Sequence, residues 1–156
     1  MNRYLGVDVG SRRVGLAISD PLNSMALPLE TADGSKPREA AKRIVELVQE
    51  YDVGALVVGW PVEMSGQEGR AARTVGKFIE VLDVALDRRG LDVQIHKWDE
   101  RLTTHAAQSL LIEADVSRRR RKETVDQIAA AHILQGYLDS LRIQEARKRE
   151  DEEYGD

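Results

Sequence analysis

The first twenty residues constrain the fold most, because two strand-like apolar runs flank a short turn. In residues 3–9 apolar side chains alternate with other residues, and residues 14–19 are almost uniformly apolar. A glycine, a serine and two arginines lie between the two runs. This pattern predicts a β-hairpin. Asp8 lies inside the first run. Folding must therefore partly desolvate its carboxylate, which is costly unless the group finds a partner.

The rest of the chain alternates between strand and helix patterns. A weaker strand is expected over residues 26–30, at a sheet edge because Pro28 has no backbone donor. Gly59 and Pro61 fit a tight turn at the end of the following strand. The other predicted elements are helices over 37–51, 66–89, 103–114 and 124–147, strands over 55–59 and 91–97, capping boxes at 65–68 and 124–127, and a basic loop over 115–123.

This order of elements predicts an α/β fold. Three antiparallel strands followed by β-α-β crossovers should form a mixed five-stranded sheet with helices on both faces. Residues 1–144 are expected to form a single domain. Residues 145–156 are expected to be a charged tail, frayed or disordered. Ligands in such folds bind at the carboxyl ends of the strands.

Composition excludes several kinds of chemistry. The 156 residues include no cysteine, so disulfides, zinc-thiolate sites, iron–sulfur clusters and thiol catalysis are excluded, and any metal must be held by oxygen or imidazole. No membrane-spanning run or signal peptide is evident, which indicates a cytoplasmic protein with no membrane partner. The net charge of −4 argues against a general nucleic-acid binder. The tail nevertheless holds six acids and three bases, so the preceding body is nearly neutral.

Three carboxylates are candidates for a metal-dependent site. Asp8 lies near the end of the first predicted strand, Glu100 just past a later strand, and Asp126 in the first predicted turn of the last helix. If one sheet edge brings them together, they repel one another unless a proton or cation intervenes. Magnesium or manganese suits such oxygen ligands, and two ions can activate water against a phosphodiester. Each acid also has a structural alternative: a turn cap for Asp8, an ion pair with Arg101 for Glu100, and a helix N-terminal charge for Asp126.

Basic side chains lie near the candidate acids along the chain. Gly10 lets the backbone approach a phosphate, and the residues after it can contact the nucleic-acid backbone. A run of five bases directly precedes Asp126, although a solvated surface would explain such a cluster as well. Aromatic residues make up only 4%, so base stacking is expected to be minor. The candidate substrate-binding residues are Ser11, Arg12, Arg13, Arg101, Arg118, Arg119, Arg120, Arg121 and Lys122.

Four segments together carry a family resemblance that covers the chain from Tyr4 to about Leu141. They are Leu-Gly-Val-Asp-Val-Gly-Ser-Arg-Arg-Val-Gly-Leu-Ala-Ile-Ser-Asp-Pro from residue 5, Val-Gly-Trp-Pro from residue 58, Trp-Asp-Glu-Arg-Leu-Thr-Thr from residue 98, and Asp-Gln-Ile-Ala-Ala from residue 126. These segments resemble the YqgF family of Holliday-junction-resolvase-like, pre-16S ribosomal RNA nucleases, which have a ribonuclease H-like fold. Trp60 departs from the pattern, since a smaller apolar residue is usual there.

The resemblance implies a function and a set of catalytic residues. Asp8, Glu100 and Asp126 would be the catalytic, metal-binding set, acting on structured RNA or branched DNA in a bacterial cytoplasm. The leading hypothesis is a nuclease that uses magnesium or manganese to process the 5′ end of pre-16S rRNA, with ribosomal precursor particles as possible partners. The chain would act as a monomer or weak homodimer.

Three alternatives stay open at this stage. A Holliday-junction resolvase would need a symmetric dimer, because it cuts two strands. An ATPase or phosphotransferase of the actin-like kind would need a second lobe around the nucleotide. A non-catalytic nucleic-acid-binding module would retain the acids for structural reasons only.

Overall fold

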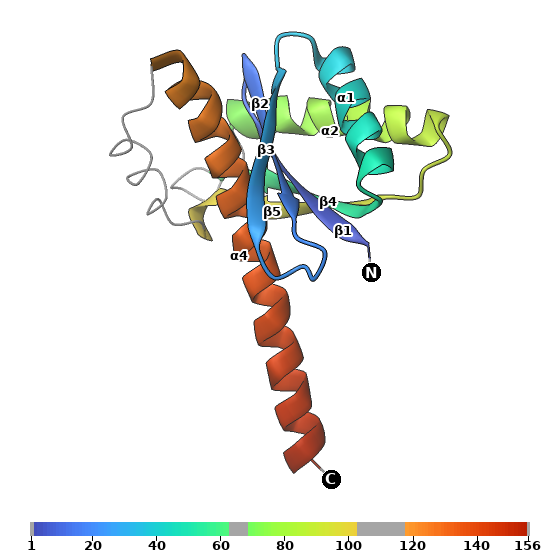
Figure 1. The fold of residues 1–156 in the computed structure, drawn as a ribbon, viewed down its shortest axis with the longest axis vertical. Helices are drawn as coiled ribbons and strands as arrows, with labels where there is room; N and C mark the ends of the chain where they lie inside the picture. Colours follow the sequence, from blue (N-terminus) through green and yellow to red (C-terminus); the bar gives the residue numbers. More distant parts are fainter. Residues whose placement is uncertain (1, 63–68, 103–117, 156) are drawn as a thin grey trace.

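A computed structural model describes residues 2–62, 69–102 and 118–155, with only the backbone for residues 118–123. Its elements follow the predicted order along the chain (Figure 1). They are β1 (Arg3–Val9), β2 (Arg13–Ser19), β3 (Ala26–Asp33), α1 (Pro37–Glu50), β4 (Val53–Trp60), α2 (Arg70–Arg88), β5 (Gln94–Asp99), η1 (Glu100–Leu102) and α4 (Arg118–Tyr154). None of the helices in these ranges is long and apolar enough to cross a membrane.

The strands form one mixed sheet in the order β3-β2-β1-β4-β5. The pairs β1–β2 and β2–β3 are antiparallel, and the pairs β1–β4 and β4–β5 are parallel. The predicted five-stranded mixed sheet is thereby confirmed, and β3, which contains Pro28, lies at an edge as expected. Because β1, β4 and β5 run in parallel, their carboxyl ends meet at one edge of the sheet.

Helices cover both faces of the sheet (Figure 1). Leu5 and Val7 of β1 join the larger core, together with Ile44 of α1 and Leu82 of α2. Alternate residues of a strand point to opposite faces, so the residues between them face α4. On that side Ala130 and other residues of α4 form a smaller core. Asp8 shares the parity of Gly6, which directly underlies Ala130 of α4.

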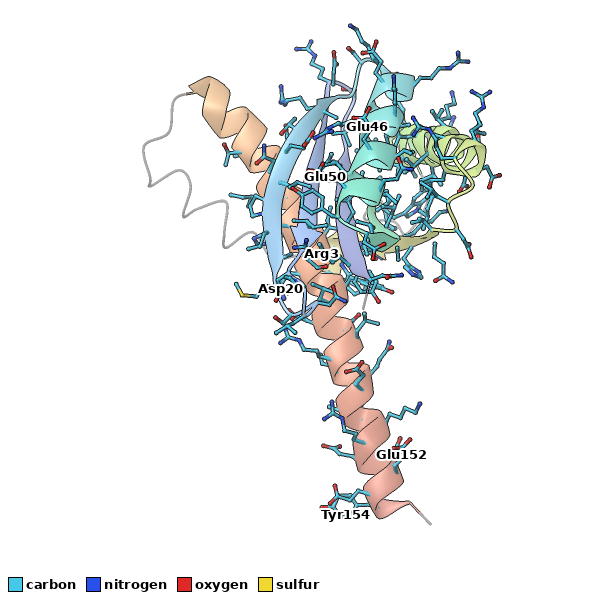
Figure 2. The ribbon with its side chains drawn as sticks, turned by 45° about the vertical axis from the view of Figure 1, so that its right-hand side comes forward. Arg3, Asp20, Glu46, Glu50, Glu152 and Tyr154 are labelled. Carbon is cyan, nitrogen blue, oxygen red and sulfur yellow. The ribbon has the colours of Figure 1, made fainter. Side chains whose placement is uncertain are left out.

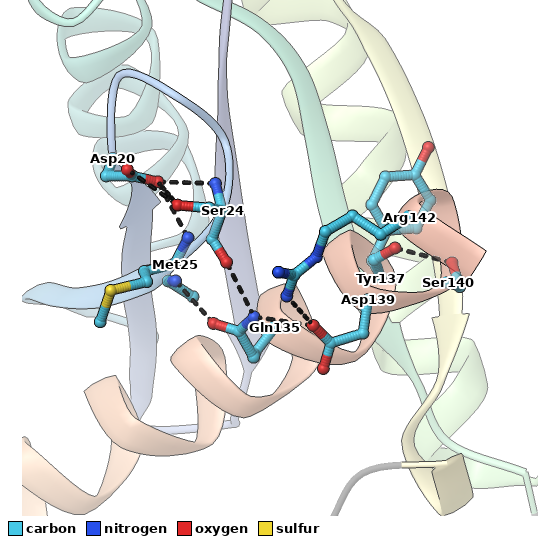
Figure 3. Close-up of polar contacts among 9 residues, drawn as sticks. Asp20, Ser24, Met25, Gln135, Tyr137, Asp139, Ser140 and Arg142 are labelled. Carbon is cyan, nitrogen blue, oxygen red and sulfur yellow. Dashed lines mark hydrogen bonds and ion pairs between the residues drawn. The ribbon is translucent and has the colours of Figure 1, made fainter. Parts of the chain in front are cut away.

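A polar network fixes α4 against the loop between β2 and β3 (Figure 3). The side chain of Gln135 accepts a hydrogen bond from the backbone of Ala26 at 2.8 Å and donates one to the carbonyl of Ser24 at 3.1 Å. Asp20 closes the loop by accepting hydrogen bonds from the backbone N–H groups of Ser24 and Met25. The direction of α4 across the sheet is therefore set by specific contacts as well as by apolar packing.

The structure corrects both predicted ends of the last helix. α4 begins at Arg118, so Thr124 lies inside the helix, and neither the capping box nor a loop through residue 123 exists there. α4 also continues beyond Arg147 to Tyr154 and projects away from the sheet, with Glu152 and Tyr154 near its far end (Figures 1 and 2). Lysine, arginine and glutamate favour helix, which explains both extensions. The tail is thus helical where a frayed segment was expected, and the domain division at residue 144 stays a prediction.

Other boundaries shift by a few residues or lie outside the described ranges. β3 continues to Asp33, three residues past the predicted end, and β5 spans Gln94–Asp99 where 91–97 was expected. Gly59 lies within β4, as the predicted strand over 55–59 has it, and β4 continues one residue further to Trp60 before the expected turn. The predicted helix over 103–114 and the capping box at 65–68 lie outside the described residues.

Candidate active site

Asp8 and Asp126 are brought together across a glycine. In the β1–β2 ladder Asp8 lies opposite Gly15. A Cβ atom at Gly15 would lie 2.0 Å from the carbonyl oxygen of Asp126, so only glycine allows α4 to approach β2 this closely. The Asp126 charge in turn acts on the Asp8 carboxyl group. A residue from α4 therefore reaches β2 directly opposite the first acid on β1.

Glu100 reaches Asp8 over a second glycine. Trp60 pairs with Asp99 at the end of the β4–β5 ladder, and Glu100 follows directly in η1. A Cβ atom at Gly59 would lie 2.9 Å from Oε1 of Glu100. The β1–β4 register, which pairs Val7 with Val58, puts Gly59 beside Asp8. The bare backbone of β4 leaves the space through which the glutamate side chain passes.

Burial and mutual repulsion keep one proton between the first two acids. Burial, the negative charges of Glu100 and Asp126, and a side-chain hydrogen bond with Glu100 together raise the pKa of Asp8 from 3.8 to about 7, with burial as the largest cause. Burial also raises the pKa of Glu100, against the opposing effect of a side-chain hydrogen bond from Asp8. Two carboxyl groups in such contact share a proton and titrate as a pair. Near neutral pH, Asp8 is the donor and Glu100 the acceptor.

The third acid is neutralised by a base from the hairpin. Arg13 Nε lies 2.5 Å from Asp126 Oδ2. The exposed fractions of the two side chains are 39% and 24%, so the pair is open to solvent on one side. Arg13, expected to bind substrate, thus holds one of the predicted metal ligands in this conformation.

The chemistry of these donors fits a hard divalent cation. Among the residues that the structure describes, no group of three or more His, Cys, Asp and Glu side chains could hold a metal ion as it stands, and Asp126 is paired with Arg13. The shared proton marks the position where Asp8 and Glu100 need positive charge. Oxygen donors at such a position are what magnesium and manganese prefer. Asp8, Glu100 and Asp126 as a ligand set therefore stay a prediction.

The other predicted site residues have different surroundings. Arg101 forms an ion pair with Asp99, with Nη2 and Oδ2 at 2.8 Å, and hydrogen bonds from Arg101 lower the pKa of Asp99. The structural alternative that paired Arg101 with Glu100 is therefore wrong. Ser11 and Arg12 are exposed in the hairpin turn. The side chains of residues 118–122 lie outside the described set, while their backbone forms the first turns of α4 ahead of Asp126.

The sequence interpretation missed the two glycines that assemble the site. Gly15 was not singled out, and Gly59 was interpreted only as the end of a strand that leads into a tight turn. A glycine inside an apolar strand often marks close approach of another backbone or a ligand. Both glycines lie inside apolar strands, and in the structure Gly15 is approached by Asp126 and Gly59 by Glu100.

Comparison with known proteins gives close relatives over most of the chain. The RuvX family, described as Holliday junction resolvase, matches residues 2–140. A Listeria innocua protein named "Putative pre-16S rRNA nuclease" is 49% identical over 140 residues, which is 88% of this chain and 98% of the relative. A protein of the same name from Roseobacter denitrificans is 42% identical over 153 residues, which is 98% and 91% of the two chains.

A solved structure shares the fold at low sequence identity. Thermus thermophilus RuvC in complex with a Holliday junction substrate is 17% identical, with a TM-score of 0.53 over 91% of this chain and 96% of RuvC. The predicted ribonuclease H-like fold is thereby confirmed. The family match and the close relatives confirm the resemblance drawn from the sequence motifs. The chain belongs to the RuvX Holliday junction resolvase family.

Proposed function

We propose that this protein is a nuclease that hydrolyses a phosphodiester bond at the 5′ end of pre-16S rRNA with the help of magnesium or manganese. The observation that carries the proposal is the convergence of three acids at the carboxyl edge of the sheet, where Glu100 passes over Gly59 toward Asp8 and Asp126 approaches Gly15 opposite Asp8. Partly buried acids that repel one another provide a place for a cation. The names of the close relatives support the RNA substrate.

The residues that would hold the metal are the three acids. A bound divalent cation supplies a polarised phosphate oxygen and a more acidic water. Asp8 and Glu100 already lie together, whereas Asp126 must first exchange its contact with Arg13. When a cation is bound, Asp8 would release the shared proton to solvent, and both carboxylates would then be available to hold the metal.

Arg13 is also proposed to bind a phosphate group of the substrate. Its guanidinium has forked donors that suit a phosphate as well as a carboxylate. The Arg13–Asp126 pair is partly exposed, so a substrate phosphate can compete for the guanidinium. Arrival of the nucleic acid would then free Asp126 for the metal. Ser11 and Arg12, exposed beside it, complete the proposed contact with the backbone of the substrate.

Other basic residues are proposed to contact the substrate. Arg101 and the run Arg118–Lys122 are proposed to bind the backbone of the precursor RNA, with precursor particles of the ribosome as the partner. The protein is proposed to act in the cytoplasm as a monomer or weak homodimer. The basic run directly precedes Asp126 on α4, which supports a role for it close to the acids.

A second candidate function is cleavage of branched DNA. The family description and the shared fold with a junction-bound RuvC favour it. Resolution of a four-way junction requires two symmetric cuts and therefore two sites in a dimer. Cleavage of a junction by a dimer, with no cleavage of precursor rRNA, would select this candidate over the first.

The decisive test is a cleavage assay on precursor rRNA, single-stranded RNA and four-way DNA junctions with magnesium or manganese. We expect EDTA to abolish cleavage and Asp8→Asn to lower the rate at least about a hundredfold, because the acid pair loses a ligand. The matched control is Asp83→Asn, which changes an exposed acid on α2 and should retain full activity. Full activity of Asp8→Asn would remove Asp8 from the mechanism. RNA binding without any cleavage would favour the non-catalytic module.

A further inference from the structure

A pocket lies beside the end of β1 that carries Asp8, on the side of the sheet covered by α1 and α2. It has a volume of about 280 Å³ and is bounded by the hairpin turn, the end of β3 and α2. Its walls include the apolar side chains of Val14, Phe78 and Val81. Phe78 is 5% exposed and belongs to the larger core, so its position in the pocket wall is fixed by packing. Nothing in the proposed cleavage chemistry uses this space.

The pocket begins one residue beyond the candidate catalytic aspartate. Val9 and Gly10, which line it, directly follow Asp8 along β1. Neighbouring residues of a strand point to opposite faces, so Asp8 faces α4 while Val9 packs with the α1–α2 core. The pocket and the Asp8 carboxyl group therefore lie on opposite faces of the sheet but only one residue apart along β1, so a strand of nucleic acid that occupied both would cross the edge of the sheet between them.

Backbone hydrogen bonds hold the rim of the pocket in place. Gly10 donates from its N–H to the carbonyl of Arg13 at 2.9 Å, which closes the hairpin turn. Gly34 donates to the carbonyl of Arg12 at 2.9 Å, which ties the end of β3 to the same turn. A ligand entering here meets a largely preformed site, and little ordering is needed on binding.

Positive charge approaches the pocket along α2. Lys77 and Thr74 line the pocket, and Ser11 lies at the hairpin side. Arg70 and Arg73 are exposed on the same face of α2 as Lys77, three to seven residues apart. Within the described part of the chain, none of these three bases takes part in an ion pair with an acid. They are available to phosphate groups.

We infer that this pocket binds the base of a nucleotide that flanks the cleaved bond, while the phosphates next to it follow Arg70, Arg73 and Lys77. The inference rests on the proposed nuclease function and adds a substrate subsite to it. The volume lies at the lower end for small-molecule pockets, which suits one base rather than a larger ligand. Apolar walls, with Phe78 among them, suit an unstacked base, and proteins bind single-stranded RNA through contacts of this kind. Base contacts thus contribute more than the low aromatic content led us to expect.

The test measures binding without cleavage. Asp8→Asn protein in EDTA is titrated with a labelled single-stranded RNA, and each base is removed in turn by an abasic substitution. We expect one position at which base removal weakens binding about tenfold, as loss of a single base contact should. A uniform profile along the strand would overturn the inference.

A pocket-filling variant assigns that position to the pocket. Thr74→Trp places a large side chain at the mouth, and Thr74 is exposed, so the fold should tolerate it. We expect it to weaken binding of the intact RNA about tenfold and to remove the sensitivity to the abasic position. The matched control is Val84→Trp, an exposed position on the same helix outside the pocket, which should change neither. Equal behaviour of the two variants would also contradict the inference.

Two further measurements distinguish failure of the pocket assignment from failure of the proposed nuclease function. A mononucleotide titration followed by amide shifts of Gly10 and Gly34 reports on the pocket whether or not the enzyme cleaves RNA. Shifts with a mononucleotide but a flat abasic profile would indicate a free-nucleotide site and overturn the strand assignment. Lys77→Gln should lower the slope of log affinity against log salt by about one, equally for intact and abasic RNA. An unchanged slope would contradict the path of the backbone along α2.

Discussion

At the scale of single residues, the surroundings of each aspartate set the pKa of its carboxyl group. Asp8 is buried beside two other acids, and this environment decides its charge, while its position in the chain only places it in a strand. The opposite environment surrounds Asp20 and Asp33, where hydrogen bonds from the neighbouring loop lower the pKa of each carboxyl group. Acids of one type thus have opposite environments in the same chain: Asp8 lies among other acids, and Asp20 and Asp33 close loops.

The raised pKa of Asp8 predicts how stability depends on pH in the metal-free protein. A folded-state pKa of about 7 against 3.8 means that the folded chain binds a proton that the unfolded chain releases. The contribution of Asp8 to stability is therefore complete below about pH 4 and is lost as the pH rises to about 7. From about pH 5 to pH 8 in EDTA, the free energy of unfolding should fall by about 2 kcal/mol.

Chemical denaturation across this pH range is the measurement, with Asp8→Asn as the comparison. The asparagine variant has no proton to lose, so its stability should be nearly flat over the same range. The lowered pKa values of Asp20 and Asp33 act at lower pH and do not enter this window. A wild-type curve as flat as that of the variant would show that Asp8 is not buried as described.

At the scale of elements, the closest approach of helix and sheet decides where the acids meet. β1, β2 and α4 each form for local reasons, namely apolar alternation in the strands and helix-favouring residues in α4. Their juxtaposition needs Gly15, because any larger residue would collide with the backbone of α4. The sequence predicts the elements well, but it leaves open which strand the last helix touches and at which residue.

Gly15→Ala should destabilise the protein and impair cleavage together. Its Cβ atom would lie 2.0 Å from the Asp126 carbonyl oxygen, so α4 must shift. Overpacking of this kind costs about 1–3 kcal/mol, and the displaced Asp126 should lower activity further. Thermal unfolding and the RNA cleavage assay measure the two effects.

Gly76→Ala is the matched control for this prediction. Its Cβ atom would approach only Trp60, at an ordinary contact distance of 3.7 Å, and it lies inside α2. Alanine favours helix over glycine by about 1 kcal/mol, so this variant should be slightly more stable than the wild type. A Gly15→Ala protein as stable and active as Gly76→Ala would refute the close approach.

At the scale of the whole molecule, a compact body carries a charged helical extension. The larger core and the smaller core under α4 are both complete before Ile143, which is 55% exposed. The helix beyond that point packs against none of the described elements, and its exposed end lies far from the sheet (Figure 2). The extension therefore contributes charge to the molecule rather than core packing.

Truncation after Gln144 should leave stability unchanged and strengthen nucleic-acid binding. The removed segment holds six acids and three bases, so the net charge of the remaining chain is less negative. Affinity for RNA should rise a few-fold at low salt, and the difference should vanish at about 1 M salt, where charges are screened over about 3 Å. Fluorescence titrations at both salt concentrations measure this.

Leu138→Ala serves as the contrasting change in the same helix. Leu138 is 1% exposed under the sheet, so its truncation should cost about 2–5 kcal/mol. If removal of the extension destabilised the protein as much as this substitution, the extension would be part of the core after all.

The sequence by itself determined the order and kind of the elements, the hairpin that carries Asp8, and the edge position of β3, because these follow from periodicity and from proline and glycine chemistry close in the chain. Only the tertiary structure decided that Asp126 is held by Arg13, that Glu100 passes over Gly59, and that Asp8 keeps a proton near neutral pH. Contacts between segments about a hundred residues apart depend on strand register and on the space left by single missing side chains. Local patterns contain neither of these, since both arise only when the layers pack.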